Sequence, residues 1–246
     1  MHVYLHRLAS PPTFFACAGR ALPWLQALAA LLLAAGAYLG LVVAPPDYQQ
    51  GDSYRIMFVH VPSAWMSLFI YLVMAGAGVV TLVWRVKLAE VIASASAPIG
   101  ASFTFLTLVT GALWGKPMWG AWWVWDARLT SELILLFLYL GYIGLEAAIP
   151  DARSAARATA ILALVGSVNI PIIHFSVEWW NTLHQGATVA RPGGPSIDSS
   201  MLVPLLLMAA GFKSFYLASL LARARCRLLE RERRSAWAQA LVKEAH

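Results

Sequence analysis

Hydrophobic positions in this chain form long continuous runs rather than the alternating or one-sided patterns of soluble strands and helices. Each run has about 20 residues, enough for a helix rising about 1.5 Å per residue to cross about 30 Å of hydrocarbon. The pattern predicts six transmembrane helices, at Leu22–Val43, Met57–Trp84, Leu88–Leu113, Leu129–Ile149, Ala158–Ser176 and Met201–Leu221. We therefore predict an all-α integral membrane protein, a bundle of six transmembrane helices in which residues 1–246 form a single domain.

Composition and cysteine usage narrow the class of protein further. The chain is 60% hydrophobic and 12% charged, whereas soluble domains are about 45–50% apolar. Cys17 and Cys226 form no CxxC pair and lie far apart in sequence, so we expect no disulfide, metal site or covalently attached cofactor through them. The first apolar run is too long for a signal peptide and ends at Pro45 and Pro46, so we interpret it as a retained helix.

Basic residues fall mainly on one side of the predicted helices. Arg20, the pair Arg85 and Lys87, and the Arg-rich tail at residues 222–246 share that side. The positive-inside rule makes this side cytoplasmic, together with both termini. The tail supplies most of the net charge of +6, and we expect it to contact anionic membrane lipid rather than nucleic acid. The outer loops are then Ala44–Ile56, Trp114–Arg128 and Val177–Ser200.

The second outer loop, residues 114–128, is unusually rich in indole. A short helix from Trp119 to Asp126 would align three of its tryptophans and the carboxylate on one face. Such a platform suits a planar, largely apolar ligand with a charged rim, such as a porphyrin. An interfacial aromatic belt is the alternative, but it accounts poorly for this density. The loop holds five of the chain's 11 tryptophans: Trp114, Trp119, Trp122, Trp123 and Trp125.

Charged residues in and near this loop have two interpretations. Asp126 can cap the fourth predicted helix, and Arg128 can pair with Asp126 or with lipid phosphate. Alternatively, Arg128 and Lys116 bind acidic groups on the ligand rim, because a guanidinium binds carboxylates bidentately. Within the spans, Glu132 is close enough to a helix end to be interfacial. Lys213 lies deeper, where a partner helix or carboxylate is expected.

Two histidines flank the tryptophan loop in sequence. His60 lies about one turn inside the outer end of the second predicted helix, on a polar helix face. His184 lies in the third outer loop, one helical turn after Trp180. Neutral imidazole is a common axial ligand of haem iron, so His60 and His184 can coordinate the iron of a porphyrin from its two faces. His174, near the outer end of the fifth helix, is a backup ligand.

Three segments carry a resemblance to a known family. The sequence reads WGAWWVWDARLTSE at Trp119–Glu132, which resembles the tryptophan-rich WWD motif of haem-handling membrane proteins. Together with FVHVP at Phe58–Pro62 and EWWNTLHQ at Glu178–Gln185, it is similar to the haem exporter protein C (CcmC) family of cytochrome c maturation. The resemblance implies a bacterial inner-membrane protein, not an enzyme, that binds haem b non-covalently and transiently at its periplasmic face. His60 and His184 would be the axial ligands.

The resemblance also implies partners. The protein would deliver haem to the haem chaperone CcmE and assemble with the small subunit CcmD and the ABC transporter subunits CcmA and CcmB. A membrane b-type cytochrome for electron transfer or quinone reaction is the alternative, but such proteins usually place their ligand pairs within the spans. A protein that transports haem unaided would need polar groups along a midplane path, and these are sparse apart from Lys213.

Overall fold

The protein is all-helical in the part of the chain that the computed structural model describes, residues 10–186, 188–189 and 191–244. Six helical segments in this part are long and apolar enough to cross a membrane, which confirms the six predicted spans. The elements are α2 (Pro11–Tyr38), a π-helical turn η1 (Leu39–Val43), a 3-10 helix η2 (Asp52–Ile56), α3 (Met57–Trp84), α4 (Lys87–Trp119), α5 (Ala127–Ala148), α6 (Ala152–Gly166), α7 (Asn169–Trp179), α8 (Ser199–Arg231) and α9 (Ala236–Glu244).

Spans in the structure extend beyond the apolar runs that predict them. A hydrophobic run marks only the part of a helix inside hydrocarbon, whereas the backbone hydrogen bonds continue into the interface. The described part of the basic tail, residues 222–244, is therefore largely helical. The longer helices are α2 from Pro11 instead of Leu22, α4 to Trp119 instead of Leu113, and α8 to Arg231 instead of Leu221.

The fifth span is interrupted rather than continuous over Ala158–Ser176. Its two parts, α6 and α7, meet at Ser167, four residues before Pro171. Proline has no N–H to donate to the carbonyl four residues earlier, so the helical hydrogen bonding stops here. Asn169 lies at the break, and its Nδ2 donates to the Ser131 carbonyl of α5 at 2.8 Å. This bond holds the interrupted span against its neighbour.

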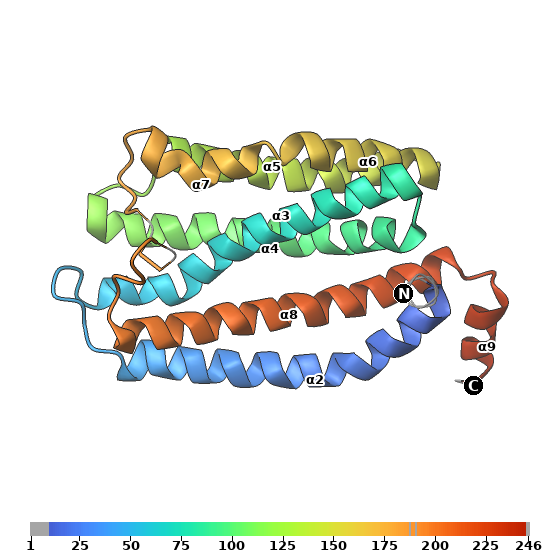
Figure 1. The fold of residues 1–246 in the computed structure, drawn as a ribbon, viewed down its shortest axis with the longest axis horizontal. Coiled ribbons are helices and arrows are strands. Elements are labelled where there is room, and N and C mark those ends of the chain that lie inside the picture. Colours follow the sequence, from blue (N-terminus) through green and yellow to red (C-terminus); the bar gives the residue numbers. More distant parts are fainter. Residues whose placement is uncertain (1–9, 187, 190, 245–246) are drawn as a thin grey trace.

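The helices pack in three side-by-side groups (Figure 1). α2 and α8 run along one edge, α5, α6 and α7 form the opposite edge, and α3 and α4 lie between them. The largest fully buried side chains of the centre are Tyr71, Tyr139 and Tyr216. Tyr71 and Tyr139 meet edge to face with 5.1 Å between ring centroids. This aromatic core joins the middle group to both edges.

A buried polar network lies between α3 and α5. Glu132, which the sequence allowed to be interfacial, is only 5% exposed. The Ser67 hydroxyl donates to Glu132 Oε1 at 2.7 Å, and the Tyr139 hydroxyl donates to the Ser67 carbonyl at 2.7 Å. A buried carboxyl group is costly unless it is hydrogen-bonded, so this network fixes α3 relative to α5.

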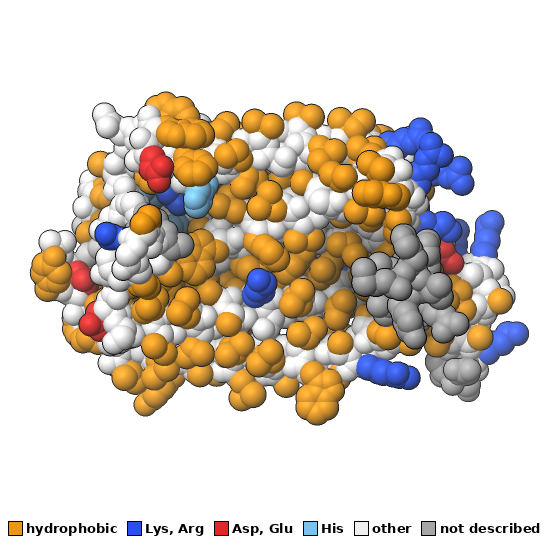
Figure 2. Space-filling model, viewed as in Figure 1, with side chains coloured by type: hydrophobic (Ala, Val, Ile, Leu, Met, Phe, Trp, Pro, Cys, Tyr) orange, Lys and Arg blue, Asp and Glu red, His pale blue; other side chains and the backbone are white. Residues whose placement is uncertain are grey.

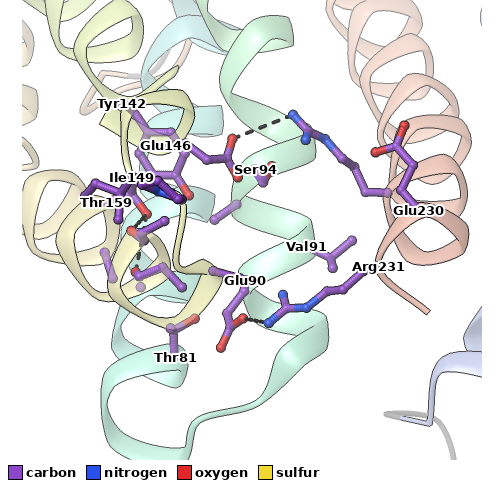
Figure 3. Close-up of a pocket in the computed structure, with 18 residues that line it drawn as sticks. Thr81, Glu90, Val91, Ser94, Tyr142, Glu146, Ile149, Thr159, Glu230 and Arg231 are labelled. Carbon is purple, nitrogen blue, oxygen red and sulfur yellow. Dashed lines mark hydrogen bonds and ion pairs between the residues drawn. The ribbon is translucent and has the colours of Figure 1, made fainter. Parts of the chain in front are cut away.

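Ion pairs join α8 to the rest of the bundle at the end where α2 begins and α9 lies. Arg231 pairs with Glu90 of α4, and Arg227 lies 3.6 Å from Glu146 of α5. The pairs border a cavity of about 340 Å³ between α3, α4, α5, α6 and α8 (Figure 3). Basic side chains gather at this end of the molecule (Figure 2).

α2 and α8 approach each other closely at small residues. A Cβ atom added to Gly211 of α8 would lie 2.8 Å from Leu33 Cδ2 and 3.1 Å from the Leu33 nitrogen. A backbone atom cannot move aside as a flexible side chain can. The contact therefore requires glycine.

We expect Gly211→Val to lower the thermal unfolding temperature of the detergent-solubilised protein, because overpacking a helix contact costs about 1–3 kcal/mol. Gly144→Val is the matched control, since Gly144 is helical and nothing lies within 4 Å of its added Cβ. Equal losses in the two variants would show that helix propensity, and not the α2–α8 contact, sets the effect.

Candidate functional site

His60 lies in the first turns of α3 and faces α4. Its Nδ1 lies 3.0 Å from the hydroxyl oxygen of Thr110. That hydroxyl donates its single proton to backbone carbonyls of its own helix, at 2.6 Å to Leu106, so it accepts from the imidazole. Nδ1 therefore carries the ring proton, and Nε2 keeps its lone pair. An added Cβ on Gly111 would lie 3.0 Å from His60 Cε1, so the α4 backbone also limits where this ring can lie.

His184 is held by the carboxylate that begins α5. Its Nδ1 lies 3.2 Å from Asp126 Oδ2, and the Asp126 side chain is 6% exposed. Asp126 Oδ1 accepts from the Leu129 N–H at 2.8 Å, so the same residue is the N-cap of α5. Burial lowers the pKa of His184, and the negative charge of Asp126, which acts to raise that pKa, does not fully offset the effect of burial. The ring is neutral at neutral pH, donates from Nδ1 and has an unprotonated Nε2.

The two histidines each contact a tryptophan of α4. Trp114 meets His60 edge to face at 5.7 Å between ring centroids, and Trp119 meets His184 in the same way at 4.9 Å. Trp114 is held in place because its Nε1 donates to Gln50 Oε1 at 2.9 Å. The end of α4 therefore brings both imidazoles into one site.

The other three tryptophans lie in the segment between α4 and α5. Trp123 and Trp125 are in edge-to-face contact at 5.3 Å between centroids. Trp122 is 56% exposed and Trp125 is 75% exposed. The Nε1 of Trp123 is buried and has no hydrogen-bond partner among the described residues. The segment thus presents apolar ring surface and one unused donor.

Two basic residues border this segment. Arg128 is half-buried in the first turn of α5, two residues after Asp126. Lys116 donates to the Gly120 carbonyl at 3.0 Å, and its ammonium lies 5.9 Å from the Trp122 ring centroid. Arg128 therefore sits beside the site, whereas Lys116 stabilises the turn that ends α4.

The predicted helix from Trp119 to Asp126 is wrong. α4 already includes Trp114 and continues to Trp119, where Gly120 ends it with φ of +75°. Such a left-handed conformation favours glycine and terminates helices. The segment then runs without regular structure to Asp126, so its tryptophans do not form one helical face. The tryptophan cluster combines a helix end with an irregular segment.

The predicted placement of His184 one helical turn after Trp180 is also wrong, because α7 ends at Trp179 and Trp180 is extended. His184 is positioned instead by Asp126 and by the Thr182 hydroxyl, which accepts from the His184 N–H at 3.0 Å. His174 is exposed on α7, and its ring packs edge to face against Phe175 of the same helix with 4.7 Å between ring centroids.

Sequence reasoning missed three residues that position the site: Thr110, Gly111 and Gln50. Thr110 follows Thr104 and Thr107 along α4 at helical spacing, which was the available signal. Nothing in the sequence alone pairs this threonine with His60, because the contact depends on how α3 packs against α4.

The fold and this site define a class: a polytopic helical membrane protein with two histidines and a tryptophan cluster at one end of its bundle. The family model of CcmC, heme exporter protein C, matches residues 4–239. The chain belongs to the CcmC family, and it is a multi-pass protein of the bacterial inner membrane.

Relatives match nearly the whole chain. Heme exporter protein C of Bradyrhizobium diazoefficiens is 56% identical over 228 residues, which cover 93% of this chain and 86% of the relative. Heme exporter protein C of Haemophilus influenzae is 52% identical over 242 residues, 98% of each chain. A putative cytochrome c biosynthesis ccmC-like mitochondrial protein of Marchantia polymorpha is 48% identical over 205 residues, 83% of this chain and 87% of the relative.

Asp126→Asn tests how His184 is held. An asparagine oxygen still caps α5, but its NH₂ group then faces His184 Nδ1, which must accept and leave the ring proton on Nε2. We expect ¹⁵N NMR of histidine-labelled protein to show this change of tautomer. The unfolding temperature of Asp126→Asn should fall no further than that of a control variant, Asp151→Asn. Asp151 caps α6 and is the matched control, because the described partner of its side chain is the Ser154 backbone. An unchanged His184 tautomer would contradict the assignment.

Proposed function

We propose that this protein binds haem between His60 and His184 and passes it on during c-type cytochrome biogenesis. The observation that carries the proposal is the hydrogen-bonding geometry of the two imidazoles. Each commits Nδ1 to a hydrogen-bond acceptor, Thr110 for one and Asp126 for the other, and each keeps Nε2 unprotonated. Metal-bound histidines usually have this arrangement, in which an acceptor at the second nitrogen fixes the tautomer.

The surrounding residues fit haem rather than a bare metal ion. Among the described residues, no three His, Cys, Asp or Glu side chains converge as a metal site. A porphyrin supplies four nitrogen ligands itself, so two imidazoles suffice to complete six-coordinate iron. The tryptophans Trp119, Trp122, Trp123 and Trp125 offer ring surface for its apolar faces.

Haem is anionic at its rim, and the site has matching groups. Arg128 can pair with a propionate, and the unused Trp123 Nε1 is a donor that a carboxylate can accept from. Asp126 orients His184 and is already engaged through both oxygens. We therefore assign Arg128 and Trp123 to the propionate side, and Asp126 to the positioning of the ligand.

The charge distribution supports an outward-facing site. Basic side chains gather at the α9 end of the bundle, opposite the histidines (Figure 2), and this end is cytoplasmic by the positive-inside rule. Both termini then lie in the cytoplasm, and the segment 114–128 lies at the periplasmic face.

An outward-facing haem site supports delivery to a periplasmic acceptor. We assign this role to the haem chaperone CcmE, with CcmD and the transporter subunits CcmA and CcmB as partners. Bound haem is therefore non-covalent haem b and is held transiently. Release requires His184 or its segment to move, because His184 is in an irregular segment whereas His60 is fixed between two long helices.

Removing either imidazole tests the proposal. We expect His60→Ala and His184→Ala to lose haem during purification in mild detergent, because haem that is bound only transiently needs both axial ligands. The two variants should therefore deliver no haem. Absorption spectra normalised to protein measure the retained haem. His174→Ala is the control and should keep it. Wild-type haem content in both variants would refute the site.

The hydroxyl partner of His60 can be tested separately. Thr110→Val removes the acceptor for Nδ1 and leaves both histidines in place, and loss of such a partner typically weakens a metal site about 10–100-fold. Thr104→Val is the matched control, because Thr104 makes the same bond to its own helix, to the Gly100 carbonyl at 2.8 Å. Haem titration should show weaker haem binding by Thr110→Val than by Thr104→Val. Equal haem affinities of the two variants would exclude a role for the Thr110 contact.

A further inference from the structure

The outward face of α8 carries a regular stripe of exposed residues. Val203, Leu206 and Leu217 are 51%, 46% and 38% exposed, and Ala210 and Lys213 are exposed between them. These five positions are spaced by three, four, three and four residues, which is the spacing of a and d positions in a coiled coil. The stripe has the form of a helix-packing seam with no helix of the described chain on it.

Lys213 lies deep in the membrane on this stripe. At about 1.5 Å per residue it is roughly 20 Å from Ser199 at one end of α8 and roughly 15 Å from Arg223 towards the other. A lysine side chain can reach the interface only from near a helix end. Its ammonium therefore stays inside the hydrocarbon and close to the helix.

The contacts of Lys213 leave its charge uncompensated. Its ammonium lies 4.7 Å from the ring centroid of Phe69 on α3, an attraction weaker than an ion pair. None of the ion pairs among the described residues includes Lys213. Figure 2 shows the hydrophobic surface of this face interrupted near its middle by positive charge. A charge at such a depth requires a partner.

We infer that the α8 stripe, together with the adjoining edge of α3, is the docking surface for a transmembrane helix of another protein that presents a carboxylate at the depth of Lys213. Charge complementarity selects this occupant. Lipid phosphate stays at the interface and does not reach this depth. The apolar residues of the stripe would pack against the docked helix on both sides of the ion pair. The buried ion pair would fix the register of that helix along α8.

A second copy of this chain does not meet the requirement. It would bring another Lys213 to a symmetric interface. The carboxylates described in its spanning helices are either buried, as Glu132 is, or close to helix ends, as Glu90 and Glu146 are. The partner is therefore a different chain. This inference is independent of haem binding.

The full-length protein in phosphatidylcholine vesicles can be titrated with synthetic transmembrane peptides. The probe is a leucine-rich helix of about 20 residues with one central Glu, and the reference peptide has Gln instead. Energy transfer between labelled protein and labelled peptide reports binding. We expect the Glu peptide to bind wild type at least about tenfold more tightly than the Gln peptide.

Three variants of Lys213 make the test specific. Lys213→Met should bind both peptides alike, and Lys213→Arg should keep the preference for Glu. Lys213→Glu should instead prefer a peptide with a central Lys, which shows that a folded variant follows the charge. Equal binding of both peptides to wild type, or undiminished preference in Lys213→Met, overturns the inference. Energy transfer between two labelled copies of the chain would also overturn the inference if Lys213→Met abolished it. That result would assign this face to self-association.

Discussion

The two oxygens of Asp126 serve two purposes, and the candidate site depends on both. One oxygen accepts from the backbone at the start of α5, and the other accepts from Nδ1 of His184. The first bond fixes the carboxylate in space because α5 is a packed helix. The second bond holds the His184 imidazole in place, although the segment that carries His184 has no regular structure. His184 thereby gains a fixed tautomer and orientation without being part of a helix.

The second histidine reaches an equivalent state by different means. His60 is part of α3, and its partner Thr110 and its neighbour Trp114 are part of α4. Below them, Ser67, Glu132 and Tyr139 join α3 to α5 through buried hydrogen bonds. His60 is therefore part of the rigid packing of α3 against α4, whereas His184 is held from an irregular segment by the Asp126 carboxylate and by its contact with Trp119. That difference suits a protein that must hold a cargo firmly and then release it.

Hydropathy predicted the six spans because hydrocarbon imposes the same length and apolarity on each of them. The site residues could be nominated because imidazole and clustered indole are rare in such a chain and have few chemical uses. The helix from Trp119 to Asp126 could not be judged correctly from spacing alone, since Gly120 ends α4 and Asp126 starts α5. Thr110 and Gly111 were missed because their importance comes from the crossing of α3 and α4, which no local pattern encodes.

We propose that both axial positions of haem iron are filled by imidazole from this chain. Electron paramagnetic resonance of the purified ferric wild-type protein tests it directly, because two neutral imidazoles give low-spin six-coordinate iron. We expect a low-spin bis-imidazole spectrum. A high-spin spectrum from five-coordinate iron in the haem-loaded protein would contradict it.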